Sequence, residues 1–386
     1  MTSSADLFET FFAVIPAGGV GTRLWPLSRA NAPKFLHDLT GSGTTLIRST
    51  YERLTPLAGE RVMVVTGVKH REAVAGQIPE LDERDLVLEP EPKDSAAAIG
   101  LAAAILHHRD QQSGCQEQGR GTIMGSFAAD QVIAPVEIFQ EAVREAVATA
   151  APTAESDGKI VTIGIKPTHP STGFGYIRAG ERYPVEGAPH AHHVVEFVEK
   201  PAEEVAQQYV ASGDYLWNAG MFVAPVALML KHLAAAEPEL HAGLTEIAAA
   251  WDTPEQEATL ERVWPTLPKT AIDYAVAEPA AAAGDVAVIP GEFTWDDVGD
   301  FAAIARLNPA AHQEGMTVLG SKARVYSEEA SGVVVADTNR VIALIGVENI
   351  VVVDTGDALL VTTTDHAQNV KKAVEALKEK GDSDVL

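Results

Sequence analysis

The chain has 386 residues, 46% of them hydrophobic, which is too long for one compact core of ordinary size and predicts one large domain with a smaller one. Its formal net charge is −25, from 54 acidic and 29 basic residues, which disfavours a broad nucleic-acid-binding face because such a surface repels phosphates. A small anion can still bind where a few lysines and arginines gather in a cleft.

The sequence also indicates the cellular compartment of the protein. A single cysteine, Cys115, cannot form an internal disulfide or a cysteine-based metal site. The first ten residues lack the basic segment that opens a signal peptide. No apolar run reaches the length of about 18 residues that a transmembrane helix needs. We therefore expect a cytoplasmic protein with no membrane and no nucleic acid among its partners.

Strands and helices alternate over the first half of the sequence. Short apolar runs predict strands at 11–16, 61–66, 122–124 and 160–165. Stretches of helical character lie at 95–105, 136–150 and 228–260. The polar stretch 110–120 is typical of a surface loop. The alternation predicts an α/β fold, with a Rossmann-like layer around a mostly parallel sheet.

The composition and the apolar pattern of the sequence change near Asn308 and Pro309. Beyond it, short Val-rich runs are separated by Asp, Asn and Gly, with a turn about every 8 to 12 residues. The predicted strands are 332–336, 341–345, 350–353 and 358–362, and a helix is predicted over 365–380. We therefore expect a large domain of residues 1–308 and a β-rich C-terminal domain of residues 309–386. A left-handed β-helix-like coil is one arrangement compatible with the spacing.

A glycine-rich loop follows the first predicted strand. It contains Gly18, Gly19 and Gly21, and its cations are Arg23 and Lys34. Glycines let backbone N–H groups approach a phosphate chain, and the two cations add positive charge beside them. No Lys-Ser or Lys-Thr follows the glycines, so this is not a Walker loop. A tight turn with two surface cations would have the same glycines.

The third glycine of a dinucleotide-binding fingerprint is also missing from this loop. Leu24 stands at its position, which argues against an NAD-dependent oxidoreductase.

Two acidic motifs lie far apart in the sequence. Asp130 follows the predicted strand 122–124, and a carboxylate just beyond the carboxyl end of a parallel strand faces the ligand crevice. Asp296 and Asp297 follow Trp295. Each motif alone is also typical of a solvated turn. Together, two distant carboxylates can converge on one hard cation such as Mg²⁺.

Several of these segments resemble one known family. Residues 18–29 read GGVGTRLWPLSR, PKF follows at 33–35, and together they resemble the signature of nucleotidyltransferases that make sugar nucleotides. Trp25-Pro26 is similar to the mannose-1-phosphate guanylyltransferase branch. Further resembling segments follow in the family's order at 89–96, 128–133, 168–178, 198–201, 217–222, 271–276 and 295–300. The resemblance implies a GT-A-like nucleotidyltransferase domain.

The resemblance also implies an activity and a site. It implies transfer of GMP from GTP to α-D-mannose 1-phosphate with Mg²⁺ as cofactor, giving GDP-mannose and pyrophosphate. The implied catalytic residues are Arg23, Lys34, Asp130 and Asp297, with Asp130 and Asp297 as the metal ligands. The implied nucleotide-binding residues are Ala17, Gly18, Gly19, Gly21, Thr22, Arg23, Lys34, Ser95 and Asp130. The implied substrate-binding residues are Gly175, Glu199, Lys200, Asn218 and Asp273.

Several alternatives stay open at this point. One is the same chemistry with another nucleotide or hexose, such as glucose 1-phosphate with dTTP or ATP. Another is a regulatory homologue that binds a sugar nucleotide without catalysis. Asn218 suits a sugar hydroxyl, because its amide both donates and accepts, but an Asn satisfied by its neighbours would look the same. Ser95 or Asp94 equally suits a helix N-cap. A homodimer is a further expectation.

Overall fold

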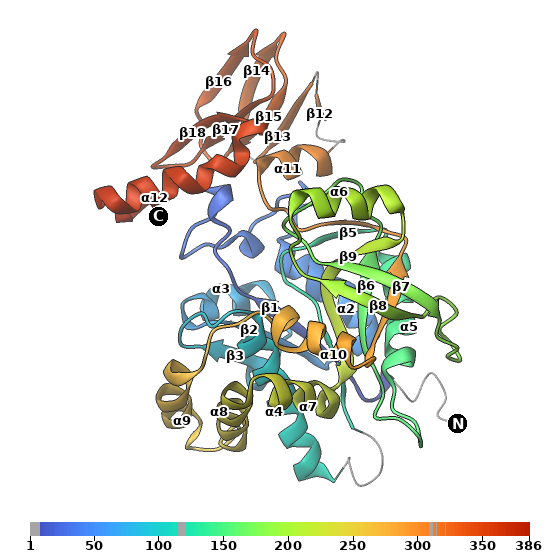
Figure 1. Ribbon diagram of the computed structural model, residues 1–386. Helices are drawn as coiled ribbons and strands as arrows, with labels where there is room; N and C mark the ends of the chain where they lie inside the picture. Colours follow the sequence, from blue (N-terminus) through green and yellow to red (C-terminus); the bar gives the residue numbers. More distant parts are fainter. Residues whose placement is uncertain (1–7, 115–120, 309–311, 314, 321) are drawn as a thin grey trace.

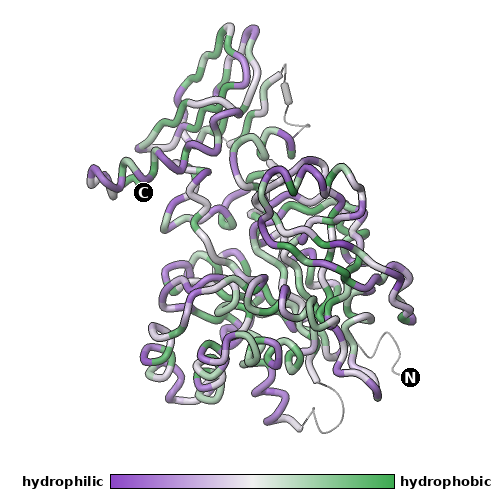
Figure 2. Tube along the Cα trace, viewed as in Figure 1, coloured by the Kyte–Doolittle hydropathy of each residue, from purple (hydrophilic) through white to green (hydrophobic). Residues whose placement is uncertain are grey.

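The computed structural model describes residues 8–114, 121–308, 312–313, 315–320 and 322–386 (Figure 1). Cys115 and Pro309 lie outside the described residues, so the exact boundary between 308 and 309 stays a prediction. Within the described ranges, no helix combines the length and the apolar character needed to cross a membrane. Figure 2 shows hydrophobic residues concentrated in the strands at the centre of the large domain.

The large domain is built on a mixed sheet with the strand order β3-β2-β1-β4-β9-β6-β10-β8-β7. Its strands are β1 (Phe11–Ala17), β2 (Val62–Gly67), β3 (Leu86–Glu89), β4 (Ile123–Ser126), β6 (Ile160–Ile165), β7 (Tyr176–Arg182), β8 (His192–Val198), β9 (Tyr215–Pro225) and β10 (Val286–Gly291). Strands β1 to β4 are mutually parallel, as the alternation predicted. The sheet as a whole is mixed, because β9 runs antiparallel between β4 and β6 and β7 and β8 form an antiparallel pair.

Helices cover both faces of this sheet. On one side α4 (Ser95–Ser113), α7 (Val226–Ala236) and α8 (Pro238–Ala249) share an apolar cluster with Val14 of β1. On the other side α2 (Leu46–Ala58) and α5 (Val136–Ala150) pack on Ala13 and Ile15. Successive strand residues point to opposite faces, so a continuous apolar run such as β1 is required where helices cover both.

Three helical predictions differ in extent from the structure. The helix predicted over 365–380 is α12 (Val370–Lys380), and a short 3-10 helix, Thr364–Asn369, precedes it. The helix α4 continues to Ser113, so the loop expected from residue 110 starts later. Its polar end is stabilised by tertiary contacts, since Arg109 pairs with Asp85 and Asp252 and Asp110 accepts hydrogen bonds from Thr122. The segment 228–260 is divided among α7, α8 and α9. The remaining helices are α3 (Arg71–Gln77), α6 (Glu203–Ser212), α9 (Gln256–Val263), α10 (Glu278–Ala282) and α11 (Phe301–Leu307).

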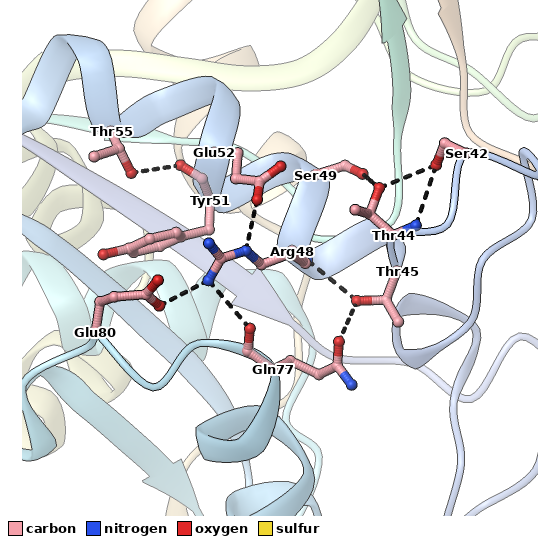
Figure 3. A network of polar contacts seen from close by, with 10 residues as sticks. All are labelled: Ser42, Thr44, Thr45, Arg48, Ser49, Tyr51, Glu52, Thr55, Gln77 and Glu80. Carbon is pink, nitrogen blue, oxygen red and sulfur yellow. Dashed lines mark hydrogen bonds and ion pairs between the residues drawn. The ribbon is translucent and has the colours of Figure 1, made fainter.

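The start of α2 is tied down by a polar network (Figure 3). Thr45 caps the helix by accepting from the Arg48 N–H at 3.4 Å, and it donates to Gln77 Oε1 at 2.8 Å. Arg48 also pairs with Glu52 and Glu80, at 2.8 and 2.7 Å. A cap of this kind adds about 1 kcal/mol, whereas exposed ion pairs add little. The network ties the start of α2 to Gln77, the last residue of α3, and to Glu80 beyond it.

The C-terminal unit is a coil of short strands. Its elements are β12 (His312–Gln313), β13 (Met316–Leu319), β14 (Arg324–Glu328), β15 (Gly332–Ala336), β16 (Val341–Ile345), β17 (Ile350–Asp354), β18 (Leu359–Thr363) and α12 (Val370–Lys380). Strands β13, β15 and β17 pair in parallel, and β14 pairs in parallel with β16. The chain therefore alternates between two sheets, which is the β-helix-like arrangement that the strand spacing allowed. Val334, Leu344 and Val352 lie in the core of the coil.

The C-terminal unit and the large domain share a further apolar cluster, here called the joint cluster. From the large domain it contains Leu24, Trp25, Leu39, Leu46, Val298, Phe301 and Ile304. From the C-terminal unit it contains Leu319, Val333, Val335, Val351, Val353, Leu360, Ala367 and Val370. The C-terminal unit is thus packed against the glycine-rich loop and the segment after Asp297.

Close packing of the coil predicts a strong glycine requirement at Gly332. Its φ is +136°, and a Cβ there would overlap the Ile350 carbonyl oxygen and lie 2.6 Å from the Ile350 nitrogen. We expect Gly332→Ala to lower the free energy of unfolding by more than about 3 kcal/mol, measured by urea unfolding. Gly346→Ala is the control, because Gly346 has a φ of +62° but open space, and should cost about 1 kcal/mol. Equal losses in the two variants would contradict the steric argument.

Candidate active site

The glycine-rich loop leaves β1 at Ala17 and turns sharply. Gly19 and Gly21 have φ values of +82° and +73°. A Cβ on Gly21 would lie 3.1 Å from Cβ of Lys34, so this glycine lets the lysine stem lie against the loop. The buried Ser28 hydroxyl donates to the Val20 carbonyl and closes the loop. The predicted loop therefore has a defined shape, with Lys34 packed along it.

Arg23 stands on a single helical turn, Thr22–Leu24. Its side chain is exposed and forms no hydrogen bond or ion pair with the part of the chain that the structure describes. Leu24, the next residue, is fully buried in the joint cluster. The turn thus presents the guanidinium outward while its neighbour anchors the backbone.

Asp130 and Asp297 are brought together by a short two-stranded ribbon. The strands β5 (Val132–Ala134) and β11 (Thr294–Asp296) are antiparallel, with Asp296 opposite Val132. Asp130 shortly precedes β5 and Asp297 directly follows β11, so both lie at the same end of the ribbon. The convergence that the sequence suggested is therefore a consequence of this strand pairing.

Lys34 joins the two aspartates. Its Nζ lies 3.0 Å from Oδ2 of Asp130 and donates to the backbone carbonyl of Asp297 at 2.6 Å. Burial raises the pKa of the Asp297 carboxyl, Lys34 opposes this shift, and the charges of Asp296 and Asp130 add to it. The site thus holds two close carboxylates whose mutual repulsion one ammonium group only partly offsets.

The adjacent Asp296 is engaged elsewhere. Its carboxylate accepts from the Val298 N–H at 2.8 Å and lies 3.2 Å from Nη2 of Arg306. These contacts leave Asp297 as the residue of the pair that faces Asp130 and Lys34. Within the described residues, no three His, Cys, Asp or Glu side chains are placed to hold a metal. A cation here would therefore rely on two carboxylates together with phosphate and water oxygens, a ligand set that suits Mg²⁺.

The residues predicted for the sugar side also converge. Asn218 is buried, and its Oδ1 accepts from Thr162 Oγ1 at 3.0 Å and from the Gly220 N–H at 3.1 Å. Its Nδ2 donates to Oδ1 of Asp273 at 2.7 Å. Three of its hydrogen-bonding positions are thus used within the protein. In the structure Asn218 chiefly orients Asp273, with one N–H left for a ligand.

Glu199 carries an unused acceptor. Its Oε1 pairs with Lys200, while its buried Oε2 has no hydrogen-bond partner among the described residues. Burial raises the pKa of Glu199, and the nearby Asp273 charge adds to the shift. A Cβ on Gly175 would overlap Oε2, so the glycine makes room for this carboxylate. A buried acceptor without a partner is costly, and a ligand hydroxyl would satisfy it.

The segment at the start of α4 holds one expected and one unexpected residue. The Ser95 hydroxyl accepts from the Ile272 N–H at 2.9 Å, which ties this segment to the one that carries Asp273. Sequence reasoning missed Glu89, the last residue of β3. It is 8% exposed, its Oε1 has no partner among the described residues, and burial raises its pKa to about 7. An acidic residue ending a buried parallel strand was the available signal.

The fold and the site can now be compared with known proteins. The family model described as nucleotidyl transferase matches residues 12–314. The chain belongs to the nucleotidyl transferase family. A second family model, described as a MannoseP isomerase/GMP-like beta-helix domain, matches residues 324–377, within the coil of short strands. The predicted α/β nucleotidyltransferase fold with a β-rich C-terminal unit is thereby confirmed.

Individual members of the family resemble the chain over nearly its whole length. It is 37% identical over 373 residues to the mannose-1-phosphate guanylyltransferase ManC of Salmonella typhimurium, and 36% identical over 373 residues to the mannose-1-phosphate guanylyltransferase of Escherichia coli K12. Each match covers 96% of this chain and 74% of the relative. A crystal structure described as mannose-1-phosphate geranyltransferase from Thermus thermophilus superposes with a TM-score of 0.79 and 32% identity, covering 96% of this chain and 99% of that one.

The buried Glu89 predicts a pH dependence of stability in this nucleotidyl transferase. A carboxyl with an ordinary pKa of 4.5 when unfolded and about 7 when folded keeps its proton longer in the folded state. Folding stability therefore falls as the pH rises from about 4.5 to 7, by about 3 kcal/mol in total. Glu89→Gln should remove this loss. In urea unfolding, the free energy of unfolding of the variant should therefore rise relative to that of the unchanged protein between pH 5 and pH 8.

The matched control for that experiment is Glu91→Gln. Glu91 lies in the same segment, but its side chain is 52% exposed and paired with Lys93. The difference in unfolding free energy between Glu91→Gln and the unchanged protein should therefore be the same at pH 5 and at pH 8. The assignment to Glu89 is wrong if the Glu89→Gln difference in stability is also the same at pH 5 and pH 8.

Proposed function

We propose that this protein transfers GMP from GTP to α-D-mannose 1-phosphate, forming GDP-mannose and releasing pyrophosphate. The observation that carries the proposal is the convergence of Lys34, Asp130 and Asp297 beside the glycine-rich loop. The long relatives named mannose-1-phosphate guanylyltransferase support the choice of substrates. A cytoplasmic location and a homodimer belong to the same proposal as predictions from the sequence.

The proposed chemistry is an in-line displacement at the α-phosphorus of GTP. A phosphate oxygen of mannose 1-phosphate forms the new bond to phosphorus, and the bond to the β-phosphate oxygen breaks, so pyrophosphate leaves with its electron pair. The second pKa of a phosphate monoester is about 6, so the attacking oxygen is already ionised at pH 7 and requires no general base. The remaining difficulty is the repulsion between two polyanions.

The residues of the nucleotide side address this repulsion. Arg23, exposed on its turn and without a partner among the described residues, can offer its donor fork to phosphate oxygens. Lys34 is held between Asp130 and the Asp297 backbone, so its ammonium group needs no reorganisation as charge develops. Asp130 and Asp297 would hold Mg²⁺, which when bound supplies charge neutralisation to the phosphates. Positioning of the two reactants provides the rest of the acceleration.

The residues of the other side suit the sugar phosphate. The free Oε2 of Glu199 accepts from a sugar hydroxyl, and Lys200, half exposed next to it, reaches the phosphate. Asn218 holds Asp273 in place, and Asp273 adds a second carboxylate for hydroxyl groups. Burial raises the pKa of Asp273, and a hydrogen bond from Asn218 favours its ionised form. The acceptors thus lie where a polyhydroxyl ligand can satisfy them.

A substrate panel tests this proposal. Pyrophosphate release should be fastest with GTP and mannose 1-phosphate in the presence of Mg²⁺, and at least about tenfold slower with other pairs. The panel combines GTP, ATP, dTTP and UTP with mannose 1-phosphate and glucose 1-phosphate. Faster release with glucose 1-phosphate and dTTP or ATP would assign a sister activity of the family. No release with any pair would leave a sugar-nucleotide-binding regulatory protein.

The two converging aspartates predict loss of activity on substitution. Asp130→Ala and Asp297→Ala should each lower the rate of pyrophosphate release by about a hundredfold or more, because each removes a carboxylate that would hold the cation, and Asp130→Ala also removes the ion-pair partner of Lys34. The thermal unfolding midpoint should change little. Asp296→Asn is the matched control, since Asp296 points to Val298 and Arg306, and it should keep most of the activity. Near-normal rates for both alanine variants at saturating Mg²⁺ would overturn the metal assignment.

A further inference from the structure

The second half of the glycine-rich loop lies against the C-terminal unit. Leu24 and Trp25 are buried in the joint cluster, beside side chains of β15 and β17. The Trp25 indole Nε1 also donates to the Val385 carbonyl at 2.7 Å. In Figure 1 the red helix α12 lies close to the blue segment between β1 and α2, and α12 contacts the turn Thr22–Leu24 that carries Arg23. The turn that carries Arg23 therefore packs against a distant part of the chain, the C-terminal unit.

Arg29 makes further polar contacts between the glycine-rich loop and the C-terminal unit. Its Nε donates to the Pro26 carbonyl of the loop at 2.9 Å. Its two terminal nitrogens donate to the carboxylate of Asp357 at 2.7 and 2.5 Å, and one of them also donates to Thr355 Oγ1 at 3.2 Å. One planar guanidinium thus holds the loop backbone and the turn between β17 and β18 at the same time. Lysine cannot reproduce this geometry, because it lacks the fork.

The electrostatics of the pair indicate a local role. The Asp357 side chain is 51% exposed, and that of Arg29 is 14% exposed. The hydrogen bonds from Arg29 lower the pKa of Asp357 to about 2, so the pair stays ionised across the physiological range. Exposed ion pairs contribute little to global stability. A bidentate pair across two structural units instead restricts their relative geometry.

The C-terminal unit also packs against the segment that follows Asp297. Val298, Phe301 and Ile304, which follow Asp297, lie in the joint cluster. Gln368 donates to Oδ2 of Asp300 at 2.5 Å. The segments that present Arg23 and Asp297 therefore rest on one common support.

We propose that Arg29 and Asp357 are positioning residues, through which the C-terminal unit holds the glycine-rich loop in its nucleotide-binding shape. The assignment to nucleotide binding rests on the proposed function, whereas the ordering of the loop by this pair does not. Neither residue contacts the reacting atoms. Without the pair the loop samples other shapes, and part of the binding free energy of the nucleotide is spent on reordering it.

The first test measures amide hydrogen exchange of the substrate-free protein. In Asp357→Asn the peptides covering residues 18–29 should exchange at least about fivefold faster than in the unchanged protein, with the thermal midpoint preserved. Glu348→Gln, which removes an exposed carboxylate from the turn between β16 and β17 of the same unit, should exchange as the unchanged protein does. Arg29→Lys should follow Asp357→Asn, because it keeps the charge and loses the fork. Unchanged exchange in Asp357→Asn overturns the proposal, whatever the substrates are.

The second test is kinetic. In Asp357→Asn the KM for GTP should rise about five- to tenfold, the KM for mannose 1-phosphate should stay the same, and kcat should change less than about twofold. At about 1 M salt the difference between variant and unchanged protein should shrink, because the exposed pair is screened. Equal KM values for GTP would overturn the nucleotide part of the inference. An unchanged protein that is inactive with every substrate pair would count against the proposed function alone, since the exchange result stands by itself.

Discussion

The site depends on the contact of Lys34 with Asp130 and with the backbone of Asp297. These three residues come from three separate parts of the chain, and only the pairing of β5 with β11 places the two aspartates at one end of a ribbon. The lysine reaches them because Gly21 has no side chain to push its stem away. The arrangement of these three charged residues therefore follows from one strand pairing and one missing Cβ.

Under the proposed function, a protein with a net charge of −25 binds polyanions here by concentrating its cations in few places. Arg23 is left without a partner in the described chain, and Lys34 is held in position. The carboxylates Glu89, Glu199 and Asp273 are buried, and burial raises the pKa of each. Burial of these carboxylates lowers the free energy of unfolding. Such a cost is expected at a site where a ligand completes the hydrogen bonding.

Local structure was predictable where one physical signal dominated. The helix 136–150 and the strands 160–165 and 332–336 match the structure at both ends. In the first the apolar period of a helix is strong, and in the other two an apolar run lies between turn residues. The end of α4 was predicted too early, because its last turns are polar and are stabilised by Asp85, Asp252 and Thr122. The mixed character of the sheet was also missed, since strand direction depends on partners distant in sequence.

The sequence by itself determined the family, the glycine-rich turn with its two cations and the α/β fold with a β-rich end. These properties follow from local patterns in the sequence, namely the spacing of the glycines, the placement of the cations and the period of the apolar residues. Only the tertiary structure decided that Asn218 is engaged with Thr162 and Asp273, that the buried Oε1 of Glu89 has no partner among the described residues, and that Arg29 joins the loop to Asp357. Each of these facts concerns which groups meet and which are left unsatisfied. Such pairing depends on residues up to 328 positions apart, which no local pattern specifies.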